Sequence, residues 1–364
     1  MLMAGGTGGH LFPAMALAQE LRRRGHAIHL MTDERVAGYG DDFPAEATHI
    51  VPSATPSIRN PAKLALAGAR ILEGTGVAFG KLGGIKADAM VGFGGYPTVP
   101  SFIAGRLRRI PGVVHDQNAV LGRANLLLAR YANALALSFA ETARAEPFAA
   151  KATLTGNPVR DRVRAVADTP YPAFGENEPV RVLVFGGSQG ARAFAELVPP
   201  AVAQLPPDLR ARLRIAQQCR PEDLDRVAEI YRQARANVEL AAFFTDLPER
   251  MAQSHLVISR SGASTVAELC VIGRPAILVP LPGSIDADQR ANAQVLDRSG
   301  GGWIAEQAAL TPTALADRLA RLLSAPGDLG KAAAVAKSLG RPDAVARLAD
   351  LAEKLALSRM QRNA

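Results

Sequence analysis

The chain has 364 residues, a length that predicts two domains of about 150 to 200 residues each. Hydrophobic residues make up 48% and charged residues 21%, which argues against a disordered, fibrous or polytopic membrane protein. The net charge of +8 favours a polyanionic partner, which by charge alone is phosphate, nucleic acid or anionic lipid. Because only 5% of residues are aromatic, few side chains can stack on the bases of a single-stranded nucleic acid, and we expect no nucleic-acid partner.

The sequence shows no pattern typical of a targeting segment, a disulfide framework or a zinc site. The first residues lack a charged region followed by an apolar stretch and a cleavage site, and no window holds 18 uninterrupted apolar residues, so we expect a cytoplasmic protein. Cys219 and Cys270 lie far apart and outside any metal-ligand spacing. We therefore expect neither a disulfide framework nor a zinc site.

The chain opens with a pattern typical of a βαβ unit. Residues 2–4 are apolar, residues 5–10 read GGTGGH, and residues 11–24 have the apolar spacing of an amphipathic helix. A second apolar run at residues 27–31 follows at the distance expected for the next parallel strand. This order predicts a strand, a glycine turn, a helix and a second strand.

The same pattern returns at residues 180–185, where an apolar run precedes GGSQG and a helical stretch from residue 191. Prolines and Gly175 among polar residues at 168–179 predict a linker, so the two halves meet near residue 165. Residues 331–357 predict one or two terminal helices. Further strands are expected at residues 89–92, 112–115, 213–217, 256–259 and 275–279. Strands alternating with helices predict an α/β protein with parallel, doubly wound sheets.

The two glycine turns suit anion binding. In parallel sheets such turns point backbone N–H groups and a helix N-terminus at a ligand beyond the strand ends. The alternative is that the glycines only permit a tight turn and bind no ligand. For a single glycine turn this alternative is favoured, but two turns at equivalent places in the two halves strengthen the case for anion binding. The first turn lacks the G-x-G-x-x-G spacing, and neither turn has the Lys-Ser/Thr pair of a Walker A loop.

His10 ends the first glycine turn at the start of the predicted helix. A helix N-terminus tends to keep an imidazole neutral and able to accept a proton, which makes His10 a candidate general base. The alternative is that it caps the helix or packs beneath the loop. Two more polar turns, GFGGYP at 92–97 and HDQN at 115–118, also follow predicted strands and converge on the same sheet edge.

In the second half, residues 259–268 read SRSGASTVAE, again a strand end, a glycine turn and a helix start. Hydroxyl and N–H groups there suit a diphosphate, and Glu268 is placed to bind a ribose diol. The alternative is an ordinary capped helix with an early acidic residue. Asp286 and Asp288 imitate an Asp-x-Asp metal motif, but two ligands in a loop do not establish a site, and we expect no metal.

Taken together, these motifs resemble those of the MurG family of N-acetylglucosaminyltransferases. The likeness covers most of the chain, in order and spacing, and rests on GGTGGH, GFGGYPTVP at 92–100, HDQN, TGNPVR at 155–160, GGSQGAR at 186–192, SRSGASTVAE and DQRANA at 288–293.

The resemblance implies a GT-B fold, two Rossmann-like doubly wound domains facing across a cleft. It divides the chain into an N-terminal acceptor- and membrane-binding domain at 1–165, a UDP-sugar-binding domain at 166–340 and a C-terminal helix at 341–364 that packs back on the first domain. It implies an inverting transfer of N-acetylglucosamine from UDP-N-acetylglucosamine to the 4-hydroxyl of undecaprenyl-diphospho-N-acetylmuramoyl-pentapeptide, without a cofactor, at the cytoplasmic face of the cell membrane.

By motif match, the resemblance also implies site residues. His10 is the catalytic base. The donor residues are Thr7, Gly8, Gly9, Asn118, Arg160, Ser188, Phe244, Ala263, Ser264, Thr265, Val266, Ala267, Glu268 and Gln289, and the acceptor residues are Gly94, Gly95, Tyr96 and His115. Two positions depart from the family pattern: Asp116 replaces a usual glutamate and Phe244 a usual aliphatic residue.

The segment 58–86 combines apolar residues with a basic rim, which suits an anionic membrane surface. The alternative, which periodicity alone favours, is a buried helix with solvated lysines. The apolar members are Leu64, Leu66, Ile71, Leu72, Val77 and Phe79, and the basic ones are Arg59, Lys63, Arg70, Lys81 and Lys86.

Two other functions use similar turns. One is another GT-B enzyme acting on a UDP-sugar, such as a diacylglycerol glycosyltransferase or a UDP-N-acetylglucosamine 2-epimerase. The HDQN and GFGGYPTVP motifs argue against both of these enzymes. The other is a non-catalytic nucleotide-sugar-binding protein, which does not need His10.

Overall fold

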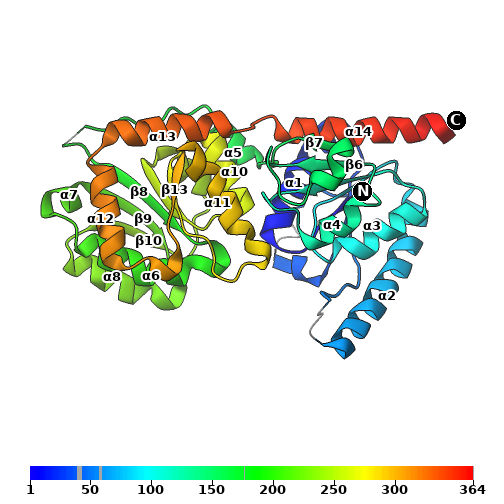
Figure 1. The fold of residues 1–364 in the computed structure, drawn as a ribbon, viewed down its shortest axis with the longest axis horizontal. Coiled ribbons are helices and arrows are strands. Elements are labelled where there is room, and N and C mark those ends of the chain that lie inside the picture. Colours follow the sequence, from blue (N-terminus) through cyan, green and yellow to red (C-terminus); the bar gives the residue numbers. More distant parts are fainter. Residues whose placement is uncertain (39–42, 57–59, 176, 364) are drawn as a thin grey trace. The chain divides into compact units, whose positions relative to one another are not determined.

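The computed structural model describes residues 1–38, 43–56, 60–175 and 177–363, without side-chain detail at 37, 38, 187–191, 285 and 363. The chain divides into two compact units (Figure 1). The first comprises Met1–Arg160 and Arg341–Ala364, and the second comprises Asp161–Gly340.

The first unit is a parallel sheet in the order β3-β2-β1-β4-β5-β6-β7 with helices on its faces. Its described strands are β1 (Leu2–Met3), β2 (His29–Thr32), β3 (Ala47–Ile50), β4 (Met90–Gly92), β5 (Gly112–Asp116), β6 (Ala134–Leu137) and β7 (Ala152–Leu154). Its described helices are α1 (Gly8–Arg23), α2 (Pro61–Ile85), α3 (Thr98–Leu107), α4 (Arg123–Ala129) and α14 (Ala344–Asn363), with short 3₁₀ turns η1 (Glu34–Gly38) and η2 (Glu146–Lys151).

The second unit repeats this plan, with strands in the order β10-β9-β8-β11-β12-β13. Its described strands are β8 (Val180–Phe185), β9 (Leu213–Gln218), β10 (Asn237–Ala241), β11 (Leu256–Ser259), β12 (Ala276–Leu278) and β13 (Gly302–Ile304). Its described helices are α5 (Asp161–Ala165), α6 (Gly187–Ala203), α7 (Pro207–Arg212), α8 (Leu224–Gln233), α9 (Leu247–Gln253), α10 (Ala263–Ile272), α11 (Asp288–Ser299), α12 (Pro312–Leu323) and α13 (Pro326–Leu339), with 3₁₀ turns η3 (Pro221–Asp223), η4 (Ile285–Ala287) and η5 (Gln307–Ala309).

Both sheets confirm the predicted α/β class with parallel strands. The order in which successive strands are added reverses between β1 and β4 in the first sheet and between β8 and β11 in the second. Ligands of such sheets bind at these switch points, beyond the carboxyl ends of the strands. The glycine motifs lie in the loops after these four strands, so the topology gathers them at the expected ligand sites.

The division between the units falls after Arg160 rather than near residue 165. The predicted linker is bound to the second unit, which explains the difference. Lys337 donates hydrogen bonds to the carbonyls of Ala167 and Val271, at 2.6 and 2.7 Å, and the buried Arg274 donates to those of Thr169 and Pro170. Each cation therefore joins the 167–170 segment to the second unit.

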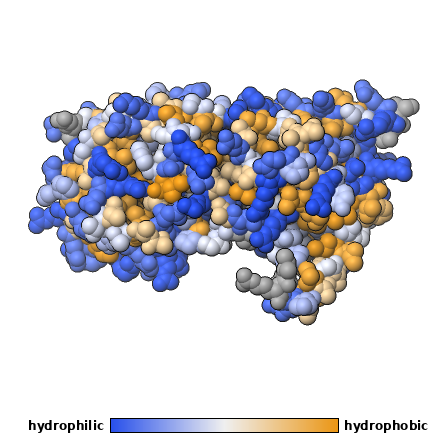
Figure 2. Space-filling model, in the orientation of Figure 1, coloured by the Kyte–Doolittle hydropathy of each residue, from blue (hydrophilic) through white to orange (hydrophobic). Residues whose placement is uncertain are grey.

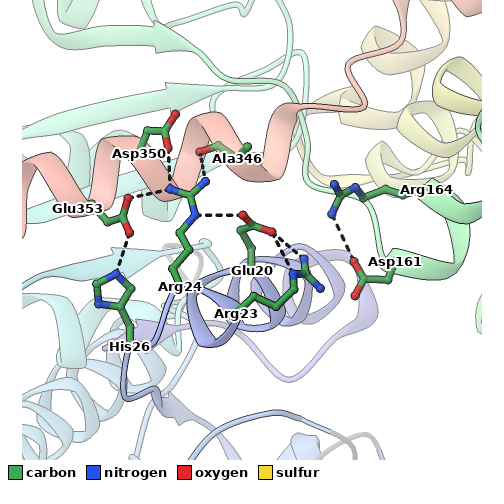
Figure 3. Close-up of polar contacts among 9 residues, drawn as sticks. All are labelled: Glu20, Arg23, Arg24, His26, Asp161, Arg164, Ala346, Asp350 and Glu353. Carbon is green, nitrogen blue, oxygen red and sulfur yellow. Dashed lines mark hydrogen bonds and ion pairs between the residues drawn. The ribbon is translucent and has the colours of Figure 1, made fainter.

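The terminal helix α14 returns to the first unit, beside α1 (Figure 1). Arg24, just after α1, forms ion pairs with Asp350 at 2.6 Å and Glu353 at 2.7 Å, and His26 lies 2.7 Å from the other oxygen of Glu353 (Figure 3). Buried Leu348 and Ala349 add apolar contacts to the core beneath α1. Packing and charge pairing together hold α14 there.

The long helix α2 packs against α3 with a buried face of mostly small residues. Its buried members are Ala67, Gly74, Ala78 and Leu82. At Gly74 a β-carbon would stand only 2.0 Å from the carbonyl oxygen of Pro52, so only glycine permits this approach. Leu64, Leu66, Leu72, Val77 and Phe79 of this helix are exposed. None of the described helices is long and apolar enough to cross a bilayer.

Candidate active site

In the first unit, the loops after β1 and β4 meet at the switch point. The N–H of Gly5 donates to the carbonyl of Gly94 at 3.3 Å. Thr7 occupies the N-cap of α1 with its side chain exposed, and Gly8 and Gly9 open the helix. The structure thus brings the GGTGGH and GFGGYP motifs together.

His10 lies in the first turn of α1 and contacts this junction. A β-carbon on Gly95 would stand 3.3 Å from His10 Cδ2 and 3.4 Å from Nε2. Gly94 and Gly95 have φ values of +87° and +75°, a region that glycine adopts without strain. Tyr96 is half-buried against the core and follows directly. Of the predicted acceptor glycines, Gly95 therefore borders the candidate base, whereas Gly94 lies against Asn125.

The HDQN motif reaches His10 through Gln117. His10 Nδ1 lies 3.0 Å from Gln117 Oε1, Gln117 Nε2 lies 2.9 Å from His115 Nδ1, and His115 Nε2 lies 3.0 Å from the carbonyl oxygen of Gly156. His115 is fully buried, and burial lowers its pKa to about 4 although the bond to Gly156 acts to raise it. The imidazole of His115 is therefore neutral near pH 7.

His115 was predicted to contact the acceptor. The structure shows that its side chain is buried and that both ring nitrogens are occupied, one of them by Gln117, and its contact with the acceptor stays a prediction. Gln117 is the residue that the sequence analysis missed. Its signal was its place two residues after a strand-end histidine, but a glutamine in a loop has many ordinary roles.

Asp116, the shorter replacement for a usual glutamate, organises the same loop. Its carboxylate accepts hydrogen bonds from the N–H groups of Asn118 and Gly122, at 2.9 and 2.8 Å, and from Asn125 Nδ2 at 2.9 Å. Burial raises the pKa of Asp116, and these bonds act to lower it. The shorter side chain therefore has defined partners within the protein, and Asn118 is positioned by its backbone.

Arg160, the last residue of the first unit, stacks its guanidinium on the ring of Phe12 at 4.5 Å from the centroid. Phe12 lies in α1, two residues after His10. The contact places a positive charge beside the same helix, in keeping with a cation–π interaction.

In the second unit, the start of α10 offers a group of unsatisfied donors. Gly262 is the N-cap, and the hydroxyls of Ser261 and Ser264 are buried, with no hydrogen-bond partner among the described residues. The first N–H groups of a helix also lack intrahelical partners, and its dipole favours negative charge there. The arrangement is suited to an anion, as the SRSGAST pattern predicted.

A buried cation lies beside this helix start. Arg260 donates to the carbonyls of Val279 and Pro280, at 3.1 and 3.3 Å, and to Gln307 Oε1 at 2.7 Å. Burial lowers its pKa, since a charged guanidinium is costly among neutral partners. An anion at the helix start would offset that cost.

The other residues predicted to bind the donor lie in several elements of the second unit. Ala263, Thr265, Val266 and Ala267 lie in the first turns of α10, and Glu268 follows with its side chain buried. Gln289, near the start of α11, accepts a hydrogen bond from the N–H of Leu281 at 3.0 Å. The Ser188 side chain lies outside the described residues. Among the described residues, His, Cys, Asp and Glu form no group of three suited to a metal, so Asp286 and Asp288 gain no further ligand.

Phe244 is only 6% exposed, and the guanidinium of Arg250 covers its ring at 4.3 Å from the centroid. Its neighbour Phe243 is 72% exposed. The ring available to a ligand in this loop is therefore that of Phe243, whereas Phe244 offers its backbone.

Comparison with known proteins identifies the family of this chain. The glycosyltransferase family 28 N-terminal domain matches residues 1–137, and the C-terminal domain of that family matches residues 181–348. A protein of Methylobacterium radiotolerans named UDP-N-acetylglucosamine--N-acetylmuramyl-(pentapeptide) pyrophosphoryl-undecaprenol N-acetylglucosamine transferase is 52% identical over 354 residues, 96% of each chain.

Two solved structures are similar in different degrees. Acinetobacter baumannii MurG is 30% identical with a TM-score of 0.78, covering 97% of this chain and 98% of its own. A putative UDP-N-acetylglucosamine 2-epimerase of Listeria monocytogenes, at 13% identity and a TM-score of 0.66 over 95% of this chain and 94% of its own, shares the fold alone. The architecture is thus common to several enzymes, but the sequence similarity is specific: this chain belongs to the MurG family.

Proposed function

We propose that this chain transfers N-acetylglucosamine from UDP-N-acetylglucosamine to the 4-hydroxyl of the undecaprenyl-diphospho-muramoyl-pentapeptide, converting lipid I to lipid II in peptidoglycan synthesis. The observation that carries the proposal is the 52% identity over 96% of the chain to the named transferase. The 2-epimerase alternative has only a shared fold in its support.

The reaction needs a base on the acceptor and stabilisation of the leaving group. In our proposal, Nε2 of His10 removes the proton of the 4-hydroxyl as its oxygen attacks the anomeric carbon of the donor. The new C–O bond forms while the bond from that carbon to the β-phosphate breaks, and its electron pair leaves with UDP. Attack from the opposite face inverts the anomeric configuration.

We propose that the start of α10 stabilises the negative charge that develops on UDP. Its unpaired N–H groups and the buried hydroxyls of Ser261 and Ser264 supply donors, and Arg260 supplies positive charge without a metal. We assign Glu268 to the ribose, Gln289 to the sugar and the Phe243–Phe244 loop to the uracil. Ser188, Thr7, Gly8, Gly9, Asn118 and Arg160 stay predictions for the donor, as Gly94, Gly95 and Tyr96 do for the acceptor.

One experiment separates transfer from binding alone. UDP-N-acetylglucosamine is titrated by calorimetry, and transfer to a short-chain lipid acceptor is measured in detergent with the same preparation. We expect donor binding and formation of a disaccharide-linked lipid. Donor binding without transfer would identify a nucleotide-sugar-binding protein, and formation of the 2-epimer of the donor would identify an epimerase.

We also propose that α2 docks the first unit on an anionic membrane, because the acceptor carries a polyprenyl chain. Leu66 and Leu72 are 66% and 74% exposed, and Leu64, Val77 and Phe79 are exposed as well (Figure 2). Large exposed apolar patches are uncommon on soluble monomers and mark binding surfaces. Ile58 and Arg59, which the prediction included, lie outside the described residues.

Basic residues lie on the same helix and at its C-terminal end. Lys63, Lys81 and Lys86 are exposed, and Arg108 lies 3.9 Å from the ring centroid of Phe79. Arg70 is paired with Glu73 at 3.0 Å, so its charge is partly neutralised. Apolar anchors with a basic rim are suited to the boundary of an anionic bilayer. Against the alternative of a buried helix stand the exposed side chains of Leu64, Leu66 and Leu72, whereas Leu82 is buried and Ile71 is half-buried against the core.

A further inference from the structure

The hydrogen-bond chain from His10 ends on a group that can only accept. The carbonyl oxygen of Gly156 has no hydrogen to give, so His115 Nε2, 3.0 Å away, must carry one. Because His115 is neutral, it carries a single ring hydrogen, and its Nδ1 is left as an acceptor.

This fixes the orientation of the Gln117 amide. The Nε2 of Gln117 lies 2.9 Å from His115 Nδ1 and 3.1 Å from the carbonyl oxygen of His115, so its two hydrogens serve two acceptors. A flipped amide would place its oxygen against that carbonyl and against the lone pair of Nδ1. Both contacts would be repulsive, and the observed orientation is therefore the stable one.

The Oε1 of Gln117 then faces His10 Nδ1 at 3.0 Å. Since an amide oxygen only accepts, His10 Nδ1 must hold the hydrogen. The lone pair of neutral His10 is left on Nε2, the nitrogen that borders Gly95.

We propose that Gln117 is a positioning residue that holds His10 in the Nδ1–H tautomer, with Gln117 itself oriented by His115. Neutral histidine in water favours the Nε2–H tautomer, which would put the lone pair on the nitrogen facing Gln117. The inference rests on the proposed role of His10 as base, because only then does the tautomer matter for turnover.

The tautomer can be read directly from the intact protein. Nitrogen-15 chemical shifts distinguish a protonated from an unprotonated ring nitrogen, and only six histidines are present. The spectrum of His10→Ala assigns the His10 signals. We expect a protonated Nδ1 and an unprotonated Nε2 in the parent at a pH where His10 is neutral.

Gln117→Met, which keeps the length and removes both polar groups, should shift His10 toward Nε2–H. The matched control is Gln217→Met, which removes another buried glutamine, one bonded to Tyr231 in the second unit. That control should leave the His10 signals unchanged. An Nε2–H signal in the parent, or an Nδ1–H signal that survives Gln117→Met, would overturn the inference without any measurement of activity.

Kinetics tests whether Gln117 acts through His10. Gln117→Met should lower kcat roughly 10- to 100-fold and leave UDP affinity unchanged, as expected for the support of a catalytic imidazole. In the His10→Ala background the same change should cost nothing further, whereas a merely structural role would add its loss. Near-normal turnover of His10→Ala would instead refute the base, and the parent tautomer would still decide the inference about Gln117.

Discussion

Gly95 lies against the imidazole of His10, so that a β-carbon there would stand 3.4 Å from Nε2. This contact, and the φ of +75°, make Gly95 a position where a methyl group affects both the fold and the site. The same turn therefore links backbone conformation to access to the candidate base.

Gly95→Ala should lower the free energy of unfolding by about 1 to 2 kcal/mol, the usual cost of a left-handed conformation for alanine. Turnover should fall as well, because the methyl group crowds Nε2. Denaturant titration and the transfer assay check both effects. The control Gly330→Ala adds a methyl group to α13 where nothing lies within 4 Å, and it should be neutral or stabilising. Parent-like stability and turnover of Gly95→Ala would contradict the argument.

His10→Ala should reduce turnover by roughly 10²-fold or more, the usual contribution of a general base, and leave UDP-donor affinity within a few-fold. Steady-state kinetics and calorimetry separate these quantities. Equal losses in donor affinity and turnover would show that His10 binds the donor instead of acting on the acceptor hydroxyl.

Ser264→Ala should weaken UDP binding by about 1.5 to 3 kcal/mol, because a hydrogen bond to a charged phosphate is lost. It should not destabilise the free protein, since the hydroxyl has no partner among the described residues. Calorimetry and thermal unfolding measure the two effects.

Ser254→Ala is the matched control for that serine. Its hydroxyl donates to the carbonyl of Arg250 at 2.7 Å, so its loss should reduce stability and leave UDP affinity unchanged. Unchanged UDP binding by Ser264→Ala would remove the hydroxyl from the proposed diphosphate site.

Replacing Leu66 and Leu72 of α2 by serine should reduce cosedimentation with anionic vesicles at every salt concentration. Leu357 and Met360 of α14 are 59% and 56% exposed in the same unit, and serine at both positions is the control. Equal losses in the two double variants would mean that exposed apolar area in general, and not α2, drives binding.

The basic rim of α2 should act differently from its apolar residues. Glutamine at Lys63, Lys81 and Lys86 should weaken vesicle binding by on the order of 1 kcal/mol per residue at low salt, and the difference should shrink as ionic strength rises. UDP-N-acetylglucosamine binding should stay intact. Parent-like cosedimentation at low salt would leave these lysines as solvated charges only.

The buried His115 makes stability depend on pH. Because its folded pKa, about 4, lies below its ordinary value of 6.5, the unfolded chain binds more protons between these values, and stability is lost as pH falls. From pH 7 to pH 5 the loss should be roughly 2 kcal/mol. Urea titrations at both pH values test this: His115→Asn should show a smaller difference than the parent, and an unchanged difference would contradict the assignment.

The sequence by itself determined the class of fold and the motifs. Alternating strands and helices require parallel sheets, and glycines after strands mark the turns where a backbone approaches a ligand, so GGTGGH, GFGGYP and SRSGAST could be placed at strand ends from spacing alone. His10 could be named as a candidate base for the same reason, and the order of the motifs over most of the chain indicated the family.

Only the tertiary structure decided which of these residues meet. Gln117 contacts His10 because β1 and β5 both pair with β4 and, being parallel, end at the same edge of one sheet. Local sequence patterns do not encode this relationship between distant parts of the chain. The periodicity of α2 indicated a helix but not its buried face, which is decided by the close approach of Pro52 and of Pro100 in α3 to Gly74. Likewise, packing under Arg250 buries Phe244 and leaves Phe243 exposed, a choice between adjacent identical residues that only packing makes.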